Sequence, residues 1–245
     1  DAQFDESQGE GRGGWSRFNK LPEEWELPIE RGDLAFKVIL SLTSYKHIGL
    51  FPEQLSNWEF IYRECSRMVK ERIGGNEGPP RVLNLFAYTG AASLAAKAAG
   101  ADVTHLDSVR QVITWARRNM ERSSLSDIRW VVEDALKFVI REERRGRRYD
   151  GIIMDPPPFG YGKRGERWRM DDSLFQLLKS VNSILALEDS FLVLNLYTNG
   201  YTPLLAETVV KESVDQLKSI EKGELSLIDQ GGRALPLGLY VRGKR

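Results

Sequence analysis

From Val82 onward, short apolar runs alternate with longer amphipathic stretches, and this alternation restricts the fold more than any other feature of the chain. It predicts a parallel β-sheet whose two faces are covered by helices. Two further apolar runs near the end of the chain predict an antiparallel hairpin at the edge of that sheet. We therefore expect an α/β fold with a seven-stranded, mostly parallel sheet, its strands at residues 82–86, 103–106, 130–132, 151–154, 191–196, 225–228 and 235–241.

The chain before residue 79 divides into two segments. Residues 1–20 are rich in glycine, serine and charge without apolar periodicity, which is typical of a flexible tail. Residues 21–78 contain a β-branched and aromatic run that ends at Ser41 and then, from Pro52, apolar side chains at helical spacing. We expect this second segment to form a small lid of short strands and a helix ahead of the main domain, residues 79–245.

The composition limits the partners and the location of the protein. Lysine plus arginine equals aspartate plus glutamate at 35 each, so any nucleic-acid surface must be local. One cysteine and two histidines argue against a disulfide framework or a zinc site, and we expect no metal. No apolar run approaches the roughly 20 residues that span a bilayer, so we expect no membrane contact. We expect an intracellular protein, either cytoplasmic or in an organelle such as the mitochondrion if the non-methionine start reflects presequence removal.

A candidate ligand-binding loop follows the first strand of the predicted sheet, in the segment Asn84-Leu-Phe-Ala-Tyr-Thr-Gly90. Ligands of open α/β sheets collect at the carboxyl ends of the strands, and a small-residue turn before a helix lets the backbone approach them closely. The Gly-x-Gly-x-x-Gly spacing of dinucleotide-binding loops is absent, which favours a nucleoside without phosphates. A plain strand-to-helix turn is the alternative interpretation.

Acidic residues stand at the ends of the next two strands. Asp107 closes the second strand and Asp134 follows the third. A carboxylate at the first position can accept hydrogen bonds from both ribose hydroxyls, and one at the second can accept from an adenine amino group. Either acid could instead cap the helix that follows it.

The most specific stretch is Asp155-Pro-Pro-Pro-Phe159, directly after the fourth strand. Consecutive prolines fix an extended backbone and remove amide donors, so we expect the carbonyl groups and Asp155 to face the pocket. Such a loop can hold a planar acceptor, with Phe159 stacking on its ring. We expect Asp155, Pro156, Pro157 and Phe159 to form the reaction site; a rigid turn that ends a core strand is the alternative.

The next segment, residues 160–169, mixes glycines, cations and aromatic side chains. This mixture is typical of a loop that contacts phosphates and unstacked bases. A surface loop with scattered charge is the alternative, because it would have the same composition. Its position beside the reaction site favours substrate contact. The candidate substrate-binding residues here are Lys163, Arg164, Arg167 and Trp168.

These segments resemble, in the same order, motifs of the bacterial large-subunit ribosomal RNA methyltransferases of the cytosine-C5 and guanine-N7 type and their uncharacterised relatives. The loop at residues 84–90 is similar to that family's Asn-Leu-Phe-x-Tyr-Thr-Gly, and residues 49–58 are similar to its Gly-x-(aromatic)-x-Asp-Gln-Arg. The other matching segments are Asp107-Ser108, Trp115-Ala-Arg-Arg-Asn119 and Asp155-Pro-Pro-x-Phe159. The likeness covers residues 46–241.

The resemblance implies a Rossmann-like class I methyltransferase that uses S-adenosylmethionine as its cofactor. It implies that Gln54 reaches the cofactor from the lid segment, whereas the residue pattern alone would also allow a polar side chain on an exposed helix face. The cofactor-binding residues that it implies are Gln54, Phe86, Ala87, Tyr88, Thr89, Gly90, Asp107, Ser108, Asp134, Ala135 and Asp155.

Two departures from the family shape the functional hypothesis. We expect no counterpart of the RNA-binding domain that precedes the lid in the best-known members. In addition, cytosine-C5 transfer needs a cysteine thiolate, and this chain has Asn-Leu-Tyr-Thr-Asn at residues 195–199, where those enzymes carry cysteine. Cys65 falls on the apolar stripe of a helix and is expected in the core. We therefore expect transfer to a nitrogen or another heteroatom, with Asp155 and Tyr197 orienting the acceptor or taking its proton.

Methylation of RNA, free or in a ribonucleoprotein, is the leading hypothesis. A protein or small-molecule methyltransferase is the second, because the net charge of zero weakens the argument for RNA. A ribonucleoprotein assembly factor that keeps the methyltransferase fold is the third. The sequence leaves the oligomeric state open.

Overall fold

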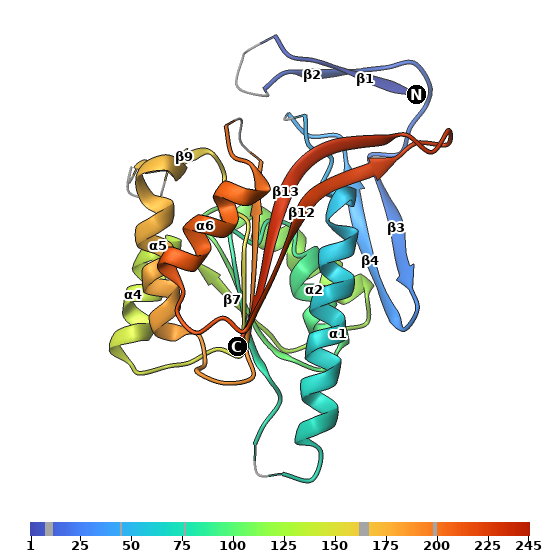
Figure 1. The fold of residues 1–245 in the computed structure, drawn as a ribbon. Coiled ribbons are helices and arrows are strands. Elements are labelled where there is room, and N and C mark those ends of the chain that lie inside the picture. The colour runs from blue at the N-terminus through green and yellow to red at the C-terminus, as the bar shows by residue number, and fades with distance from the viewer. Residues whose placement is uncertain (8–11, 45, 76, 162–166, 198–199) are drawn as a thin grey trace.

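The computed structural model describes residues 1–245 except 8–11, 45, 76, 162–166 and 198–199. Its centre is a seven-stranded sheet in the order β12-β13-β11-β8-β5-β6-β7 (Figure 1). The five strands from β11 to β7 run parallel, and β13 and β12 are antiparallel to their neighbours. The strands of the parallel part are β5 (Arg81–Leu85), β6 (Asp102–Asp107), β7 (Ile128–Val132), β8 (Gly151–Met154) and β11 (Phe191–Leu196). The predicted α/β fold is confirmed.

Helices cover both faces of this sheet (Figure 1). On one face α4 (Ala135–Arg144), α5 (Met170–Ile184) and α6 (Pro203–Ser213) pack in one apolar cluster. On the other lie α1 (Leu55–Arg72), α2 (Ala91–Ala98) and α3 (Arg110–Arg122). Every residue of β8 and β11 is buried, as expected for strands covered on both sides.

The edge hairpin is longer than the apolar runs indicate. β12 spans Ser219–Ile228 and β13 spans Ala234–Lys244, and they pair along almost their full length. The first half of β12 is mostly polar and exposed, so it carries no apolar signal. Its position is fixed instead by backbone hydrogen bonding to β13, which is itself paired with β11.

Within residues 21–78, the segment that we call the lid, the structure has an antiparallel hairpin followed by a helix. The hairpin consists of β3 (Glu24–Arg31) and β4 (Leu34–Ser41). Alternate side chains of β4, beginning with Leu34 and Phe36, are buried in the apolar cluster that also contains α1 and α2. A short 3-10 turn, η1 (Pro52–Gln54), then leads into α1.

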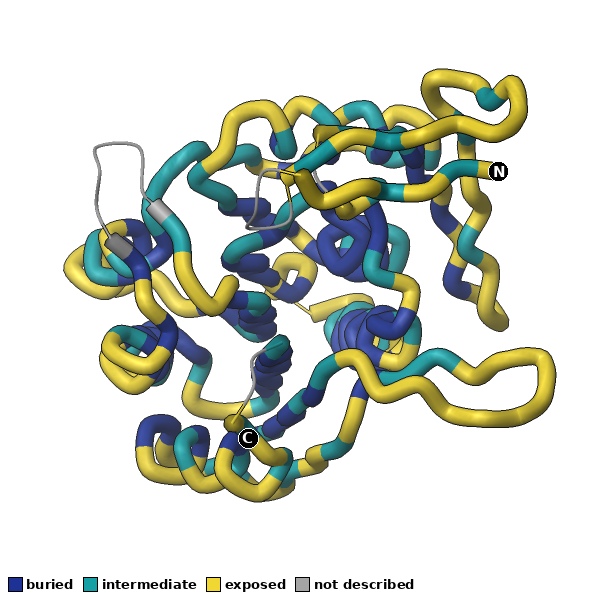
Figure 2. Tube along the Cα trace, turned by 90° about the horizontal axis from the view of Figure 1, so that it is seen from above, coloured by how far each residue is buried: buried dark blue, intermediate teal, exposed yellow. Residues whose placement is uncertain are grey.

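Residues 1–20, for which no regular structure was expected, contain a second hairpin. β1 (Ala2–Asp5) pairs antiparallel with β2 (Gly14–Arg17), largely exposed at the surface (Figure 2). The rings of Phe4 and Trp15 lie 5.2 Å apart, and Trp15 Nε1 donates a hydrogen bond to the carbonyl of Thr43. Each strand has only four residues, so its apolar pattern is too short to be recognised.

The buried side chain of Asn119 on α3 joins the lid to the loop after β5. Its Oδ1 accepts from the backbone amide of Ile39 on β4 at 2.8 Å, and its Nδ2 donates to the carbonyl of Thr89 at 2.9 Å. One turn earlier, Trp115 Nε1 donates to the carbonyl of Ile39 at 2.9 Å. Helix α3 therefore fixes the distance between the lid strand and this loop.

Replacing Asn119 by leucine keeps the side-chain size and removes both hydrogen bonds, leaving a buried amide and a buried carbonyl without partners. We expect Asn119→Leu to lower the free energy of unfolding by about 3 kcal/mol in urea denaturation. Gln111→Leu, on the exposed face of the same helix, is the control and should change it by less than about 0.5 kcal/mol. Equal effects of the two substitutions would contradict the assigned role of Asn119.

Candidate active site

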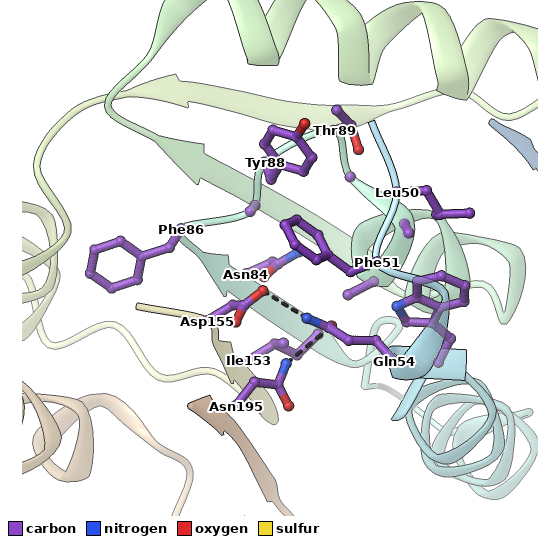
Figure 3. A pocket seen from close by; sticks show the side chains of 15 residues that line it. Leu50, Phe51, Gln54, Asn84, Phe86, Tyr88, Thr89, Ile153, Asp155 and Asn195 are labelled. Carbon is purple, nitrogen blue, oxygen red and sulfur yellow. Dashed lines mark hydrogen bonds between the residues drawn. The ribbon is translucent and has the colours of Figure 1, made fainter. Parts of the chain in front are cut away.

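A pocket lies at the carboxyl ends of β5, β8 and β11, covered by η1 of the lid segment (Figure 3). Three amide or acid side chains converge there from separate elements: Gln54 from η1, Asp155 from the end of β8 and Asn195 from β11. The residues that line the pocket are Leu50, Phe51, Gln54, Trp58, Asn84, Phe86, Ala87, Tyr88, Thr89, Gly90, Ala91, Ala92, Ile153, Asp155 and Asn195.

The loop after β5 has a strained backbone. Phe86 and Tyr88 have φ values of 57° and 49°, in the left-handed region that aromatic residues rarely occupy, and Gly90 has a φ of 93°. The amides of Ala87 and Tyr88 donate to the carbonyl of Leu106 and to Asp107 Oδ2, both at 3.0 Å. The loop is thus held in place by the end of β6, and strain of this kind is characteristic of ligand-binding loops.

Asp107 has both carboxylate oxygens directed at backbone amides. Oδ1 accepts from Val109 at the start of α3, and Oδ2 accepts from Tyr88. Burial raises the pKa of Asp107, while these amide hydrogen bonds oppose that shift. The bond from Val109 lies at the start of α3, as the helix-capping alternative predicts. The bond from Tyr88 instead holds the loop after β5. Each oxygen retains a further lone pair for a ligand.

A second pocket borders the first at Phe86. It is lined by Phe86, Leu106, Ser108, Glu133, Asp134, Ala135, Pro157, Gly160 and Trp168. Asp134 caps α4, because its Oδ1 accepts from the amide of Lys137 at 2.9 Å, as the capping alternative predicts. Its carboxylate also lines the pocket, so the two roles are compatible.

Asp155 is the acid that lines the first pocket, and its pKa is raised to about 7. Burial is the main cause, the hydrogen bond from Gln54 opposes it, and the negative charge of Glu53 adds to it. Gln54 Nε2 donates to Asp155 Oδ2 at 2.8 Å (Figure 3). A carboxyl group with such a pKa can exchange a proton near neutral pH, which is what a general base requires.

Gln54 also contacts Tyr197. It therefore links Asp155 and Tyr197, which are far from it in the sequence. Gln54 Nε2 donates to the Tyr197 hydroxyl at 2.9 Å. The pKa of Tyr197 is raised, first by burial and then by the charges of Asp155 and Glu53. Gln54 itself is only 6% exposed, so the alternative of a polar side chain on an exposed helix face is wrong.

Phe51 packs between two tyrosine rings of the site. The centre of its ring lies 5.6 Å from that of Tyr88 and 5.7 Å from that of Tyr197.

The proline loop is arranged differently from the expectation that its carbonyl groups face the pocket. The carbonyl of Pro157 accepts from Trp168 Nε1 at 2.7 Å, and that of Pro158 accepts from the amide of Met170 at 3.0 Å. Both are therefore used inside the chain. Phe159 is 57% exposed, which leaves its ring free to stack on another molecule.

The basic segment after the proline loop is described in part. Strand β9 (Phe159–Tyr161) pairs with β10 (Arg167–Arg169), whereas Lys163 and Arg164 lie outside the described residues, as does the side chain of Arg167. Trp168 was expected to contact substrate. It is buried instead, with its ring 5.1 Å from that of Phe86.

Cys65 is buried on α1, and burial raises its pKa, which disfavours the thiolate. Among the described residues no group of three histidine, cysteine or acidic side chains could hold a metal ion. In the same part of the chain, no helix combines the length and hydrophobicity needed to cross a membrane.

Sequence reasoning missed Asn84, Asn195 and Phe51 as lining residues. The two asparagines had a usable signal, because each interrupts an otherwise apolar, buried strand, where an amide needs a specific partner. Asn195 Nδ2 donates to Gln54 Oε1 at 3.1 Å, and Asn84 Nδ2 donates to Ser93 Oγ at 2.9 Å. Phe51 carries no comparable signal, since its place depends on how the lid folds over the sheet.

Comparison with known proteins gives relatives of two kinds. The chain is 35% identical to an S-adenosylmethionine-dependent methyltransferase of Agrobacterium tumefaciens, with a TM-score of 0.87 over 100% of this chain and 77% of that one. It is 28% identical over 177 residues to the ribosomal RNA large subunit methyltransferase K/L of Shewanella frigidimarina, covering 71% of this chain but only 23% of that protein. The chain thus spans about a quarter of the length of this second relative.

A methyltransferase crystallised with S-adenosylhomocysteine shares the fold at 20% identity, with a TM-score of 0.70, over 92% of this chain and 57% of that one. The family model described as S-adenosylmethionine-dependent methyltransferase matches residues 23–222, which include the lid hairpin, both pockets and most of the sheet. The chain therefore belongs to the S-adenosylmethionine-dependent methyltransferase family.

Proposed function

We propose that this protein transfers a methyl group from S-adenosylmethionine to a nitrogen or another heteroatom of a ribosomal RNA base. The observation that carries the proposal is Asp155, a partly buried carboxyl group with a pKa raised to about 7, which lines the same pocket as the strained loop at residues 86–90. An acceptor that carries a proton, such as an exocyclic amine or a hydroxyl, loses it when the methyl group is transferred, and a general base of this pKa can take that proton and orient the lone pair.

The two pockets share Phe86 as a lining residue, and a nucleoside with an amino-acid arm would extend across both. We assign the nucleoside end to the second pocket, which is lined by Ser108, Asp134 and Ala135. Asp107, the last residue of β6, does not line this pocket but directly precedes Ser108. We assign the amino-acid end to the first, with Gln54, Phe86, Ala87, Tyr88, Thr89, Gly90 and Asp155. When bound, the cofactor supplies an electrophilic methyl group on a sulfonium. Trp168, packed on Phe86, serves as a wall of the nucleoside pocket.

The acceptor base would sit against the loop formed by Pro156, Pro157 and Phe159. Proline rings hold this loop rigid, and the exposed ring of Phe159 can stack on a base. The carboxylate of Asp155 would accept the proton that the acceptor loses, while the hydroxyl of Tyr197 orients the base. Most of the rate enhancement would then come from positioning.

A cysteine-dependent route to a carbon acceptor has no support in this pocket. Cys65 is fully buried on α1 with a raised pKa, and it does not line the pocket. The segment at the end of β11, residues 195–199, reads Asn-Leu-Tyr-Thr-Asn and contains no cysteine. A nitrogen or oxygen acceptor, which is already nucleophilic, requires no such residue.

The choice of RNA rests on two supports. The Shewanella frigidimarina relative is named a ribosomal RNA methyltransferase, and the cations at Lys163, Arg164 and Arg167 follow the reaction site in the sequence. Ribosomal RNA also places the protein inside the cell. The two relatives whose organisms are named above are bacterial proteins, and they give no support to the mitochondrial location that the sequence leaves open.

Asp155→Asn keeps the size and hydrogen-bonding oxygen of the side chain but removes the base. We expect methyl transfer to ribosomal RNA to fall by about 10²- to 10⁴-fold, with binding of S-adenosylhomocysteine retained in calorimetry. Cys65→Ala is the control and should keep its transfer activity. Normal transfer by the Asp155 variant would remove the role assigned to this residue.

The raised pKa of Asp155 predicts a pH dependence of its own. Only the ionised carboxylate can take a proton, so transfer should rise about tenfold per pH unit below the pKa of about 7 and level off above it. The pH profile of single-turnover transfer measures this. The transfer rate of Asp155→Asn should not show this rise with pH. A rise that persists in the variant would show that another group titrates.

The acceptor class can be tested with a tritiated methyl donor and two separate extracts, total RNA and total protein. We expect label in ribosomal RNA, because the base-stacking ring of Phe159 and the cations after it suit a nucleic acid. Label confined to protein would support the alternative of a protein methyltransferase. Failure to bind S-adenosylhomocysteine in calorimetry would instead support an assembly factor without catalysis.

A further inference from the structure

A row of buried hydrogen bonds links Arg242 on β13 to Asp155 in the pocket. Arg242 Nε donates to Asn57 Oδ1 at 2.7 Å, and Asn57 Nδ2 donates to Asn195 Oδ1 at 2.6 Å. Asn195 Nδ2 donates to Gln54 Oε1 at 3.1 Å, and Gln54 Nε2 donates to Asp155 Oδ2 at 2.8 Å. The row therefore crosses from β13 through α1, β11 and η1 to the end of β8.

All bonds of this row run in one direction, and the chemistry of its two ends requires that direction. A guanidinium has donors but no acceptor, so the atom of Asn57 that faces Arg242 must be the oxygen. The nitrogen of Asn57 then faces Asn195, and the nitrogen of Asn195 faces Gln54. Turning over any single amide would place two oxygens or two nitrogens face to face in a buried site, which costs about 1–3 kcal/mol for each unsatisfied group.

We propose that Arg242 is a positioning residue: through Asn57 and Asn195 it fixes the amide of Gln54 with its nitrogen toward Asp155 and Tyr197. This inference rests on the proposed role of Asp155 at the acceptor. With the amide so fixed, the Tyr197 hydroxyl accepts from Gln54, and its own proton is available to the acceptor or to Glu53. Arg242 and Asn57 do not line the pocket, so they act on it only through the row.

A purely structural role for Arg242 is the competing explanation. Its guanidinium also pairs with Glu221 at 3.0 Å, donates to Ser56 Oγ at 2.9 Å, and lies 4.1 Å from the ring of Tyr240. Loss of these contacts would reduce stability without any effect on Asp155. The two explanations differ in one measurable quantity, the pKa of Asp155.

Lys244 supplies a matched control for that difference. It lies two residues along β13 from Arg242, faces the same ring of Phe60, and pairs with a buried acid of α1, Glu64, at 2.6 Å. It makes the same kinds of contact between the same strand and helix, but it has no bond to the amide row. Lys244→Met should therefore reproduce any loss of strand-to-helix packing and leave Asp155 unchanged.

The test is the titration of Asp155 in the ligand-free full chain, followed by NMR of ¹³C-labelled aspartate and assigned with Asp155→Asn. The Gln54 hydrogen bond lowers the pKa of Asp155, while burial and Glu53 raise it, so freeing the amide should raise it. We expect an increase of about one pH unit in Arg242→Met and in Asn57→Leu, and no further increase in the double variant. Lys244→Met should stay within about 0.2 units of the wild type.

An unchanged pKa in Arg242→Met or in Asn57→Leu, or an equal shift in Lys244→Met, would overturn the proposal. If Arg242→Met fails to fold in urea titrations, Asn57→Leu carries the test alone. The titration requires neither cofactor nor RNA, so its outcome is independent of whether the protein methylates RNA. A shifted pKa without methyl transfer would refute the proposed function and leave the row of hydrogen bonds intact.

Discussion

The carboxyl group of Asp155 is partly buried, which raises its pKa, and the polar contacts around it follow from that constraint. A buried acid needs either a proton or donors, and Gln54 supplies the donor here. Gln54 in turn is held by Asn195, which is fully buried in β11. A side chain in the lid and a side chain in the sheet therefore satisfy each other, and the lid is bound to the sheet by the same interactions that set the proton affinity of Asp155.

The lid is joined to the sheet in a second place, and the two attachments have different physical characters. At the pocket, the amide of Gln54 bonds the carboxyl group of Asp155, whose charge changes with pH. At Asn119 and Trp115 the attachments are neutral hydrogen bonds to the backbone of β4 and of the loop after β5. Gly49 belongs to this second place, because Thr89 Oγ1 donates to its carbonyl at 2.7 Å and a Cβ there would collide with the ring of Trp115. The strained backbone of Phe86 and Tyr88 lies between these attachments, which oppose its relaxation.

Particular residues show where sequence reasoning succeeds. The strands β5, β6, β8 and β11 follow from their apolar runs, and the turn at Gly90 follows from its place between a strand and an alanine-rich helix. Asp134 both caps α4 and lines a pocket, so each of its two sequence-based interpretations describes part of its role. The hairpin of β1 and β2 and the polar half of β12 were not predicted, because cross-strand pairing, rather than side-chain pattern, holds them. Trp168 was predicted to contact substrate because its segment mixes cations and aromatic side chains, but its indole ring packs against Phe86 and donates a hydrogen bond to the carbonyl of Pro157.

The sequence by itself determined the positions of most strands along the chain, the apolar faces of the helices and the edge of the sheet where the functional loops gather. These depend on local periodicity and on the direction of parallel strands, which neighbouring residues specify. Only the tertiary structure decided which polar groups meet there. Gln54 and Asp155 are 101 residues apart, and Asn57 and Arg242 are 185 apart. An amide has a donor and an acceptor and can bond either way in sequence, so its direction is fixed only when the fold places a guanidinium at one end of the row and a carboxylate at the other.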